Sequence, residues 1–310
     1  MKFNVVKLKP IWYTLSVIMI AGSIAMLSMW GLKQGIDFTG GSLLAVRFSA
    51  TSGTASGVER RPTSVEVQQV LDQTKIDLGT VVIQPVGDTD MQMSLRNMTE
   101  EEHQKVFGDL QKAFGNVTEL RFDSIGPVVG EELRQKSFRG LIIALVAILF
   151  YVAYAFRKVS SPVKSWKYGV VTILAAFHDV IIPVGVFAFL GHFYGVEIGT
   201  SFIAAILTIL GYSITDTIVV MDRIRENLTK LNGSFADIVA TSVRQTFLRS
   251  FSTSMTTLLA LFAIYFFGGE SLHEFTLTLI IGIAVGTYSS IFIASPLLVS
   301  WQSLSAKLRK

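Results

Sequence analysis

Four ionisable residues lie inside or at the start of long apolar stretches of this sequence. They are His178 and Asp179 in one stretch, Asp216 in the next, and Arg249 where a third begins. An ionised side chain at the centre of a membrane helix costs about 3 kcal/mol on insertion scales, and such residues commonly mark proton or ion pathways. The residue types therefore predict an ion-coupling site in the membrane, with these four residues as candidates.

Asp216 and Arg249 are expected at similar depth on consecutive helices. If the fourth span ends near residue 221, Asp216 lies about 7–8 Å inside it, at 1.5 Å per residue, and Arg249 opens the fifth span on the same side. Opposite charges placed in this way could pair. The competing interpretations are an arginine that snorkels to the interface and a helix-end carboxylate that interacts with loop arginines.

Hydroxyl groups accompany both charges at helical spacing and could hold a water wire between titrating groups. Tyr212 and Ser213 precede Asp216 by four and three residues, and three hydroxyls follow Arg249 on one helix face: Ser252, Thr253 and Thr256. Thr215, directly before Asp216, adds a further polar group to this pathway. His178 and Asp179 are adjacent, so their side chains point about 100° apart on a helix. They need not share a site, and a packing role is favoured for His178.

The charged residues must be positioned by membrane helices. Only 16% of the 310 residues are charged and half are apolar, whereas soluble domains carry about 25% charged residues. Six stretches approach the roughly 20 apolar residues that a span needs; they are 11–31, 138–156, 168–190, 197–221, 250–267 and 275–299. The first is too long for a signal-peptide core and is expected to stay as a helix.

Charge and composition exclude several classes of function. The sequence has no cysteine, which excludes disulfides, thiol catalysis and thiolate metal sites. The net charge of +4 does not indicate nucleic acid, because the basic residues sit at the ends of apolar runs. Lys and Arg concentrate in the N-terminus, the 157–167 and 222–249 loops and the tail. This distribution predicts that both termini are cytoplasmic.

The expected division is 1–31 for the N-terminus and first helix, 32–137 for an outer domain, 138–301 for helices two to six, and 302–310 for a basic tail. Within the outer domain the pattern reads strand, helix, two strands, helix, strand, with capping boxes that begin at Thr63 and Thr99. This order is typical of a ferredoxin-like α+β domain. Its one histidine, His103, is expected in solvent, and no catalytic group or metal site is expected there.

Two glycine motifs flank the outer domain. The first, residues 35–41, contains Gly35, Asp37, Gly40 and Gly41; alone it indicates a turn that leaves the membrane, with Asp37 as a local cap. The second contains Gly126, Pro127 and Gly130 and leads into the second span. It is interpreted as a hinge at 126–130 or as a rigid connector. In the sixth span, Gly282, Gly286, Ser290 and Ala294 recur every four residues and predict a close-packing face.

These motifs, in this order, resemble the SecF family over nearly the whole chain. The segments that carry the resemblance are the two glycine motifs, 176–180 (AFHDV), 205–227 with Asp216, and 249–259 with Arg249. One departure is Thr215, because the family usually has Asn before this aspartate. SecF and its partner SecD belong to the resistance-nodulation-division superfamily.

The resemblance implies an accessory of the Sec translocon in the bacterial plasma membrane that uses the proton motive force to help preproteins across. It implies a SecD-like subunit and a SecYEG-like channel as partners, with YajC-like and insertase subunits in addition, and neither an enzymatic activity nor a cofactor. The alternatives are half of a proton-coupled small-molecule exporter of the same superfamily, and a structural scaffold. An intramembrane aspartyl protease is disfavoured, because Asp179 and Asp216 lack the sequence contexts of that class.

Overall fold

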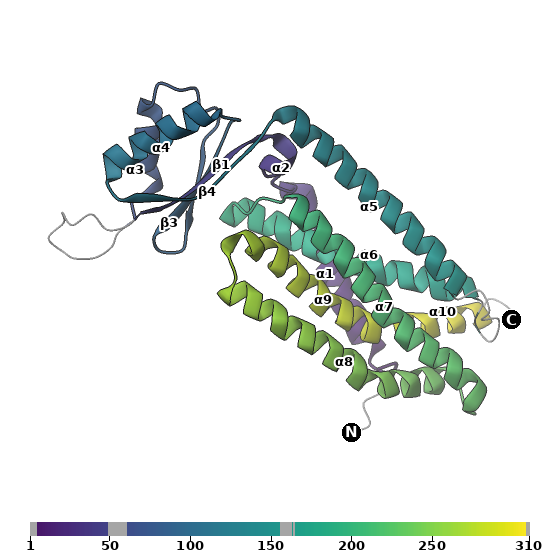
Figure 1. Ribbon diagram of the computed structural model, residues 1–310. Coiled ribbons are helices and arrows are strands. Elements are labelled where there is room, and N and C mark those ends of the chain that lie inside the picture. Colours follow the sequence, from purple (N-terminus) through teal and green to yellow (C-terminus); the bar gives the residue numbers. More distant parts are fainter. Residues whose placement is uncertain (1–4, 49–60, 156–162, 164, 308–310) are drawn as a thin grey trace. The chain divides into compact units, whose positions relative to one another are not determined.

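The structure is a computed structural model that describes residues 5–48, 61–155, 163 and 165–307 (Figure 1). Contacts divide the chain into two compact units. One comprises residues 1–33 and 139–310, and the other is Gln34–Phe138. The second unit corresponds to the predicted outer domain, and the first holds the predicted spans.

Among the described residues, six helical segments are long and apolar enough to cross a membrane, as the sequence predicted. Their elements are α1 (Lys9–Trp30), α5 (Pro127–Ala155), α6 (Ser165–Tyr194), α7 (Thr200–Lys230), α8 (Phe235–Phe267) and the continuous series α9 (His273–Ser289), a π-helical turn η2 (Ser290–Ala294) and α10 (Ser295–Lys307). A short 3-10 turn, η1 (Glu270–Leu272), precedes α9. The predicted hairpin between the last two spans is therefore present.

Two predicted helix limits were wrong. α7 continues to Lys230 instead of ending near residue 221, and α8 begins at Phe235 instead of residue 250. The polar residues beyond the apolar runs stay helical because Ser234 caps α8 through the Asp237 N–H and Asn227 of α7 donates to Ser242 of α8 at 2.8 Å. An apolar run shows which part of a helix can lie in lipid, but it does not show where the helix ends.

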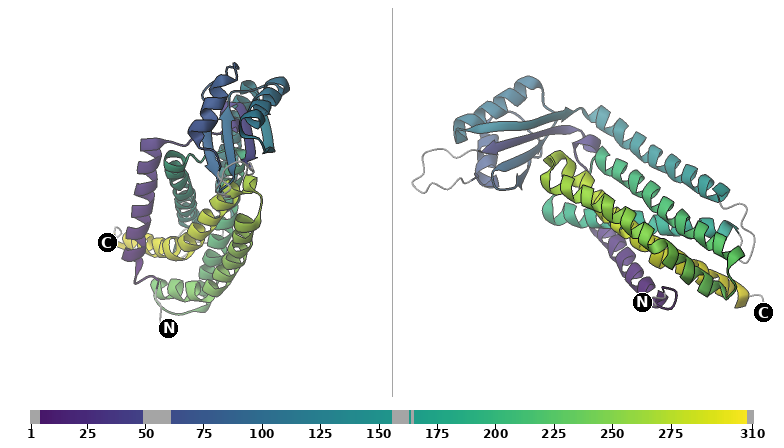
Figure 2. Two further views of the ribbon diagram at one scale, coloured as in Figure 1. Left: turned by 90° about the vertical axis from the view of Figure 1, so that its left-hand side faces the viewer. Right: turned by 60° about the horizontal axis from the view of Figure 1, so that its bottom comes forward.

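Small residues set how closely the membrane helices approach. A Cβ placed on Gly185 of α6 would lie 2.3 Å from the Cβ of Ser23 on α1, and one on Gly282 of α9 would lie 2.2 Å from the Ile209 side chain on α7. A Cβ on Gly286 would lie 3.1 Å from the Cβ of Ser213. The predicted small-residue face of the sixth span therefore packs against α7. Both views in Figure 2 show α7, α8 and α9 running side by side.

The second unit has the predicted ferredoxin-like order. Its elements are α2 (Ile36–Thr39), β1 (Gly41–Phe48), α3 (Ser64–Gln73), β2 (Val82–Val86), β3 (Asp90–Leu95), α4 (Glu100–Phe114) and β4 (Val117–Ile125). The four strands form one sheet in the order β2-β3-β1-β4, and every neighbouring pair is antiparallel. Both capping boxes are formed, by Thr63 with Glu66 and by Thr99 with Glu102. The core lies between the sheet and the two longer helices, around Leu44, Val67, Met93 and Leu110.

One expectation for this unit was wrong. His103 is buried, not solvated: its ring stacks on Phe122, and its nitrogens lie 3.3 Å from a Glu100 oxygen and 3.0 Å from a Glu119 oxygen. The carboxylates satisfy a ring that the sheet covers. The residue before α2 is Gly35, and Asp37 lies inside the first turn of that helix.

Candidate functional site

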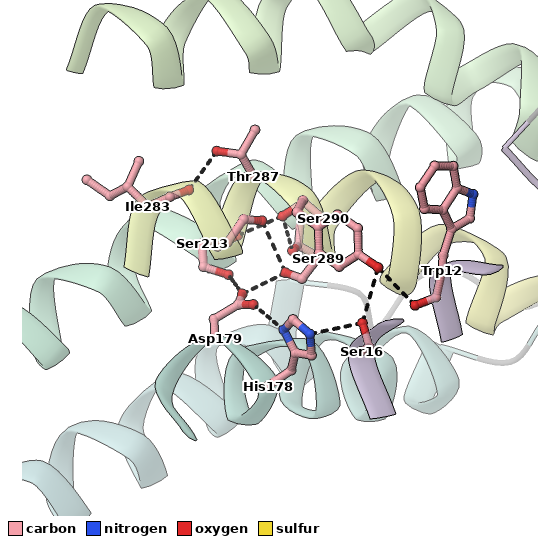
Figure 3. A network of polar contacts seen from close by, with 12 residues as sticks. Trp12, Ser16, His178, Asp179, Ser213, Ile283, Thr287, Ser289 and Ser290 are labelled. Atoms are coloured by element: carbon pink, nitrogen blue, oxygen red, sulfur yellow. Dashed lines mark hydrogen bonds and ion pairs between the residues drawn. The ribbon is translucent and has the colours of Figure 1, made fainter. Parts of the chain in front are cut away.

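Asp179 is the centre of a buried polar network in the membrane helices (Figure 3). It lies in the middle of α6 and is completely buried. Its Oδ2 accepts hydrogen bonds from Ser213 of α7 and, at 2.7 Å, from Ser289 at the end of α9, while its Oδ1 lies 2.8 Å from Nδ1 of His178. One carboxylate therefore joins three helices.

His178 shares this site, contrary to the expectation that it packs separately. Its side chain is 2% exposed, and its Nε2 lies 3.0 Å from Oγ of Ser16 on α1. Ser16 also contacts the hydroxyl of Tyr288, which donates to the backbone oxygen of Trp12. Adjacent residues on a helix can converge when one ring is long enough to turn back along the backbone, and the short Nδ1–Asp179 bond shows that this ring does so.

A π-helical turn adjoins the network. Ser290 opens η2, and its Oγ lies 2.9 Å from Oγ1 of Thr217 on α7. π-turns inside α-helices occur frequently at functional sites. Where α9 meets this turn, consecutive hydroxyls contact two different helices: Ser289 bonds to Asp179 of α6 and Ser290 bonds to Thr217 of α7.

Asp216 lies on the same helix as Ser213 but faces a different neighbour. Its Oδ1 accepts a hydrogen bond from Ser250 of α8, and its Oδ2 is buried without a hydrogen-bond partner in the described structure. Arg249 is exposed and forms no ion pair with Asp216. The two residues are also farther from their helix ends than predicted. The predicted pairing is thus replaced, in this structure, by a bond to the residue next to the arginine.

The predicted hydroxyl residues divide between a buried and an exposed face. Ser213 belongs to the Asp179 network, and Tyr212 lies within reach of Ser254 and Thr257 of α8, at 3.4 and 3.5 Å. The others are exposed in this chain, and two of them, Thr215 and Thr256, bond to carbonyls of their own helices; the exposed set is Thr215, Ser252, Thr253 and Thr256.

Several network residues were missed by the sequence reasoning: Ser16, Ser250, Ser254, Thr287, Tyr288 and Ser289. Thr287 donates to Ser254 at 2.6 Å, which ties α9 to α8. The run Thr287–Ser290 is four consecutive polar residues in an otherwise apolar span. That run was a usable signal, but only Ser290 was noticed, as a small residue in a packing stripe.

The two glycine motifs contact each other within the second unit. A Cβ on Gly130, in the first turn of α5, would lie 2.7 Å from the backbone nitrogen of Gly40, and one on Gly40 would lie 2.7 Å from Cα of Pro127. Gly40 and Gly41 have φ values of 71° and 135°, which L side chains rarely adopt. Gly126 links β4 to α5, and a Cβ placed on it would meet nothing within 4 Å. Close backbone contact therefore explains Gly40, Gly41 and Gly130. Within the described residues, no group of three or more His, Asp or Glu could hold a metal ion.

Comparison with known proteins assigns the chain to a family. The profile described as protein export membrane protein SecD/SecF, C-terminal, matches residues 106–304, and the SecD/SecF GG motif profile matches residues 31–52. The chain belongs to the SecD/SecF family. Two of the buried charges, Asp179 and Asp216, and the π-turn all lie within the longer match.

The relatives of this SecF-type chain are similar over nearly its whole length. The protein translocase subunit SecF of Thermobaculum terrenum is 42% identical over 97% of the chain and 94% of that protein. SecF of Sebaldella termitidis is 36% identical over 96% and 91%. A crystal structure of SecDF from Thermus thermophilus, described as a translocon-associated membrane protein, is 33% identical with a TM-score of 0.79; the match covers 97% of this chain and 39% of that one.

Proposed function

We propose that this chain is the SecF subunit of a protein translocase. The carrying observation is the full-length similarity to proteins named protein translocase subunit SecF, which extends through both units and the GG motif. The six spans make it a multi-pass membrane protein. In this assignment the chain lies in the bacterial plasma membrane, with both termini in the cytoplasm and the second unit outside. Its role is to assist the transport of preproteins, and it is not an enzyme.

An exposed face on α7 supports a SecD-like partner. On α7 the exposed residues recur at helical spacing and are small or hydroxylic: Ala204, Thr208, Gly211 and Thr215. A Cβ on Gly211 would meet nothing within 4 Å, whereas Gly282 and Gly286 are filled by α7. The hydroxyls of Thr208 and Thr215 bond to carbonyls of their own helix, so this face presents small residues, and stripes of small residues are typical of helix–helix contacts in membranes. A second membrane subunit would cover this face.

The length of the homologous SecDF chain argues against the alternative that this chain is an exporter that works alone. The chain matches 39% of the SecDF chain, so the homologous fused protein contains substantial further sequence. A SecD-like subunit would supply that part here, and the assembly would work with a SecYEG-like channel, YajC-like and insertase subunits, and a preprotein as substrate.

Ion coupling is assigned to the buried carboxylates. Asp216 is half-buried with one unbonded oxygen, and Arg249 is adjacent to Ser250, which donates to Asp216. Asp179 and His178 form the second ionisable pair. Protonation of Asp216 would remove the charge that the Ser250 bond supports and change how α7 and α8 pack. Moving one charge across the membrane releases about 2.3 kcal/mol per 100 mV of membrane potential, which is the free energy available to change this packing. The outer unit would follow by a hinge near Gly126, the open glycine of residues 126–130.

The test is preprotein translocation into inverted vesicles with and without a proton motive force. Asp216→Asn and Arg249→Met should assemble normally but abolish the gradient-stimulated part of export, and the double mutant should be no worse than either single one. Asp222→Asn is the matched control, because Asp222 is on the same helix but exposed and paired with Arg225. Gradient-stimulated export by Asp216→Asn would exclude Asp216 as the coupling carboxylate, and Asp179 would then be tested.

A further inference from the structure

The His178–Asp179 pair is connected to α1 by a short chain of hydrogen bonds. From Nε2 of His178 the chain passes to Ser16 at 3.0 Å, from Ser16 to the hydroxyl of Tyr288 at 3.4 Å, and from Tyr288 to the backbone oxygen of Trp12 at 2.9 Å. Figure 3 shows these contacts running from α6 to α1. The chain ends at a backbone carbonyl, which can only accept a hydrogen bond.

Counting hydrogens along this chain fixes what His178 must carry. A tyrosine hydroxyl and a serine hydroxyl each have one hydrogen. Tyr288 gives its hydrogen to the carbonyl, so its oxygen can only accept one from Ser16. Ser16 must then accept from the Nε2–H of His178, and a second hydrogen must lie between Nδ1 and Oδ1 of Asp179. All bonds are made together only when the His178–Asp179 pair holds both hydrogens, as a protonated ring beside an ionised carboxylate or as a neutral ring beside a protonated carboxyl group.

Loss of one proton changes the direction of the chain. A neutral ring with its hydrogen on Nδ1 keeps the bond to Asp179, but Nε2 becomes an acceptor. Ser16 must turn its only hydrogen toward His178, and Tyr288 then loses its donor. The state of the His178–Asp179 pair therefore determines whether α6 and α9 hold α1 through a continuous set of bonds.

We propose that His178, Asp179, Ser16 and Tyr288 form a proton-dependent clamp on α1. The clamp would join α1 to α6 and α9 by one continuous set of bonds when the histidine–aspartate pair carries its proton, and would lose its Ser16–Tyr288 bond when the proton leaves. It rests on the proposed function, because it gives the ion flux a mechanical output on the helix that leads into the outer unit. His178 and Asp179 are the proton-holding residues, and Ser16 and Tyr288 are positioning residues that act through them.

α1 is built as a lever for such a clamp. α1 approaches α6 closely at Ser23, whose Cα would lie 2.4 Å from a Cβ on Gly185, so we take Ser23 as the pivot. Ser16 lies seven residues before the pivot and Trp30 seven residues after it, so both arms are about 10 Å long. A displacement at Ser16 would therefore reach the outer end of α1 at nearly the same size.

The groups that face the clamp from neighbouring elements are few. α9 brings Tyr288 and Ser289, α7 brings Ser213 and carries Asp216, whose carboxylate is bonded to α8, and η2 brings Ser290. The ionisable side chains near the start of α1, Lys9 and Tyr13, contact Ser300 of α10 instead. Asp216 is therefore the other carboxylate whose titration must be separated from that of the clamp.

The experiment measures α1 directly. The chain has no cysteine, so Met29→Cys on α1 and Phe267→Cys on α8 can carry spin labels; both native side chains are largely exposed at the ends of their helices. The complex with its SecD-like partner is reconstituted in lipid, and the label-to-label distance is measured by pulsed electron resonance at acidic and alkaline pH. The parent should shift by about 2 Å, the size of helix displacements at bistable interfaces.

Four variants, each carrying both labels, decide the outcome. His178→Gln, Ser16→Ala and Tyr288→Phe should abolish the pH-dependent shift, and Tyr13→Phe should keep it, because that hydroxyl on α1 lies outside the clamp. No shift in the parent, or a full shift in His178→Gln or in Tyr288→Phe, would overturn the proposal. If Asp216→Asn loses gradient-stimulated export while α1 does not respond to pH, the proposed function stands and the clamp is refuted.

Discussion

Gly130→Ala tests the backbone contact between the two glycine motifs. Alanine normally stabilises a helix over glycine by about 1 kcal/mol. Here the new Cβ would lie 2.7 Å from the nitrogen and 3.2 Å from Cα of Gly40, and backbone atoms cannot rotate away. Overpacking of this kind costs about 1–3 kcal/mol. The two effects oppose each other, and the contact should outweigh the helix propensity.

Gly108→Ala is the matched control. Gly108 is also inside a helix of the outer unit, but a Cβ there would meet nothing within 4 Å. The control should be stabilised by up to about 1 kcal/mol, so the two variants should differ by about 1–3 kcal/mol. In a domain of this size each kcal/mol shifts Tm by about 4–8 °C.

The assay is urea and thermal unfolding of a fragment of residues 34–138, followed by circular dichroism. The fragment is expected to fold alone, since it has its own sheet and core. If Gly130→Ala is as stabilising as Gly108→Ala, the contact does not constrain the backbone and the reasoning fails. A disordered parent fragment would show that this unit depends on the rest of the chain.

Three further predictions concern topology, acid stability and helix packing. Single cysteines at Ser56 and Ser160, both outside the described residues, should label from outside and inside respectively; the reverse pattern in intact cells would overturn the orientation. Hydrogen bonding to the Arg47 guanidinium holds the pKa of Asp90 below its usual range. Arg47→Ala should therefore have a lower free energy of unfolding than the parent at neutral pH, and this difference should disappear as the pH falls below about 3.9 and Asp90 is protonated. An undiminished difference at pH 2 would contradict this. Gly282→Ala should lower the thermal stability of the purified complex, because its Cβ would overlap an α7 isoleucine; unchanged melting would refute close packing there.

The outer unit was largely predictable because its signals are local. Each capping box combines a Thr with a Glu three residues later, and each strand is bounded by turn residues. The order of these elements then allows few topologies. His103 was misjudged because its burial depends on β4, which the helix pattern alone cannot show.

The membrane site was predictable in its charges but not in its partners. An aspartate in an apolar helix is conspicuous, so Asp179 and Asp216 were found. Which hydroxyl reaches which carboxylate depends on helix rotation and on the π-turn, and helical spacing around Arg249 selected the exposed face of α8 instead of Ser250. The predicted pairing of Asp216 with Arg249 rested on their depth in the membrane, measured from the ends of the apolar runs. Both helices extend past those runs, so the measured depths were wrong.

The π-turn at Ser290–Ala294 also sets the rotational phase of the chain's last helix. A wider turn accommodates one residue more than an α-helix would, and one residue corresponds to about 100° of rotation. Because the π-turn holds this extra residue within nearly the same total rotation, the helix beyond it keeps its phase. If the residue were instead part of a regular α-helix, all of α10 would be turned by that angle. Ser300 and Ser305 would then point away from Lys9 and Lys167, which they now contact at 3.1 and 2.6 Å. The length of this one turn thus determines which side of the final helix meets the start of the chain.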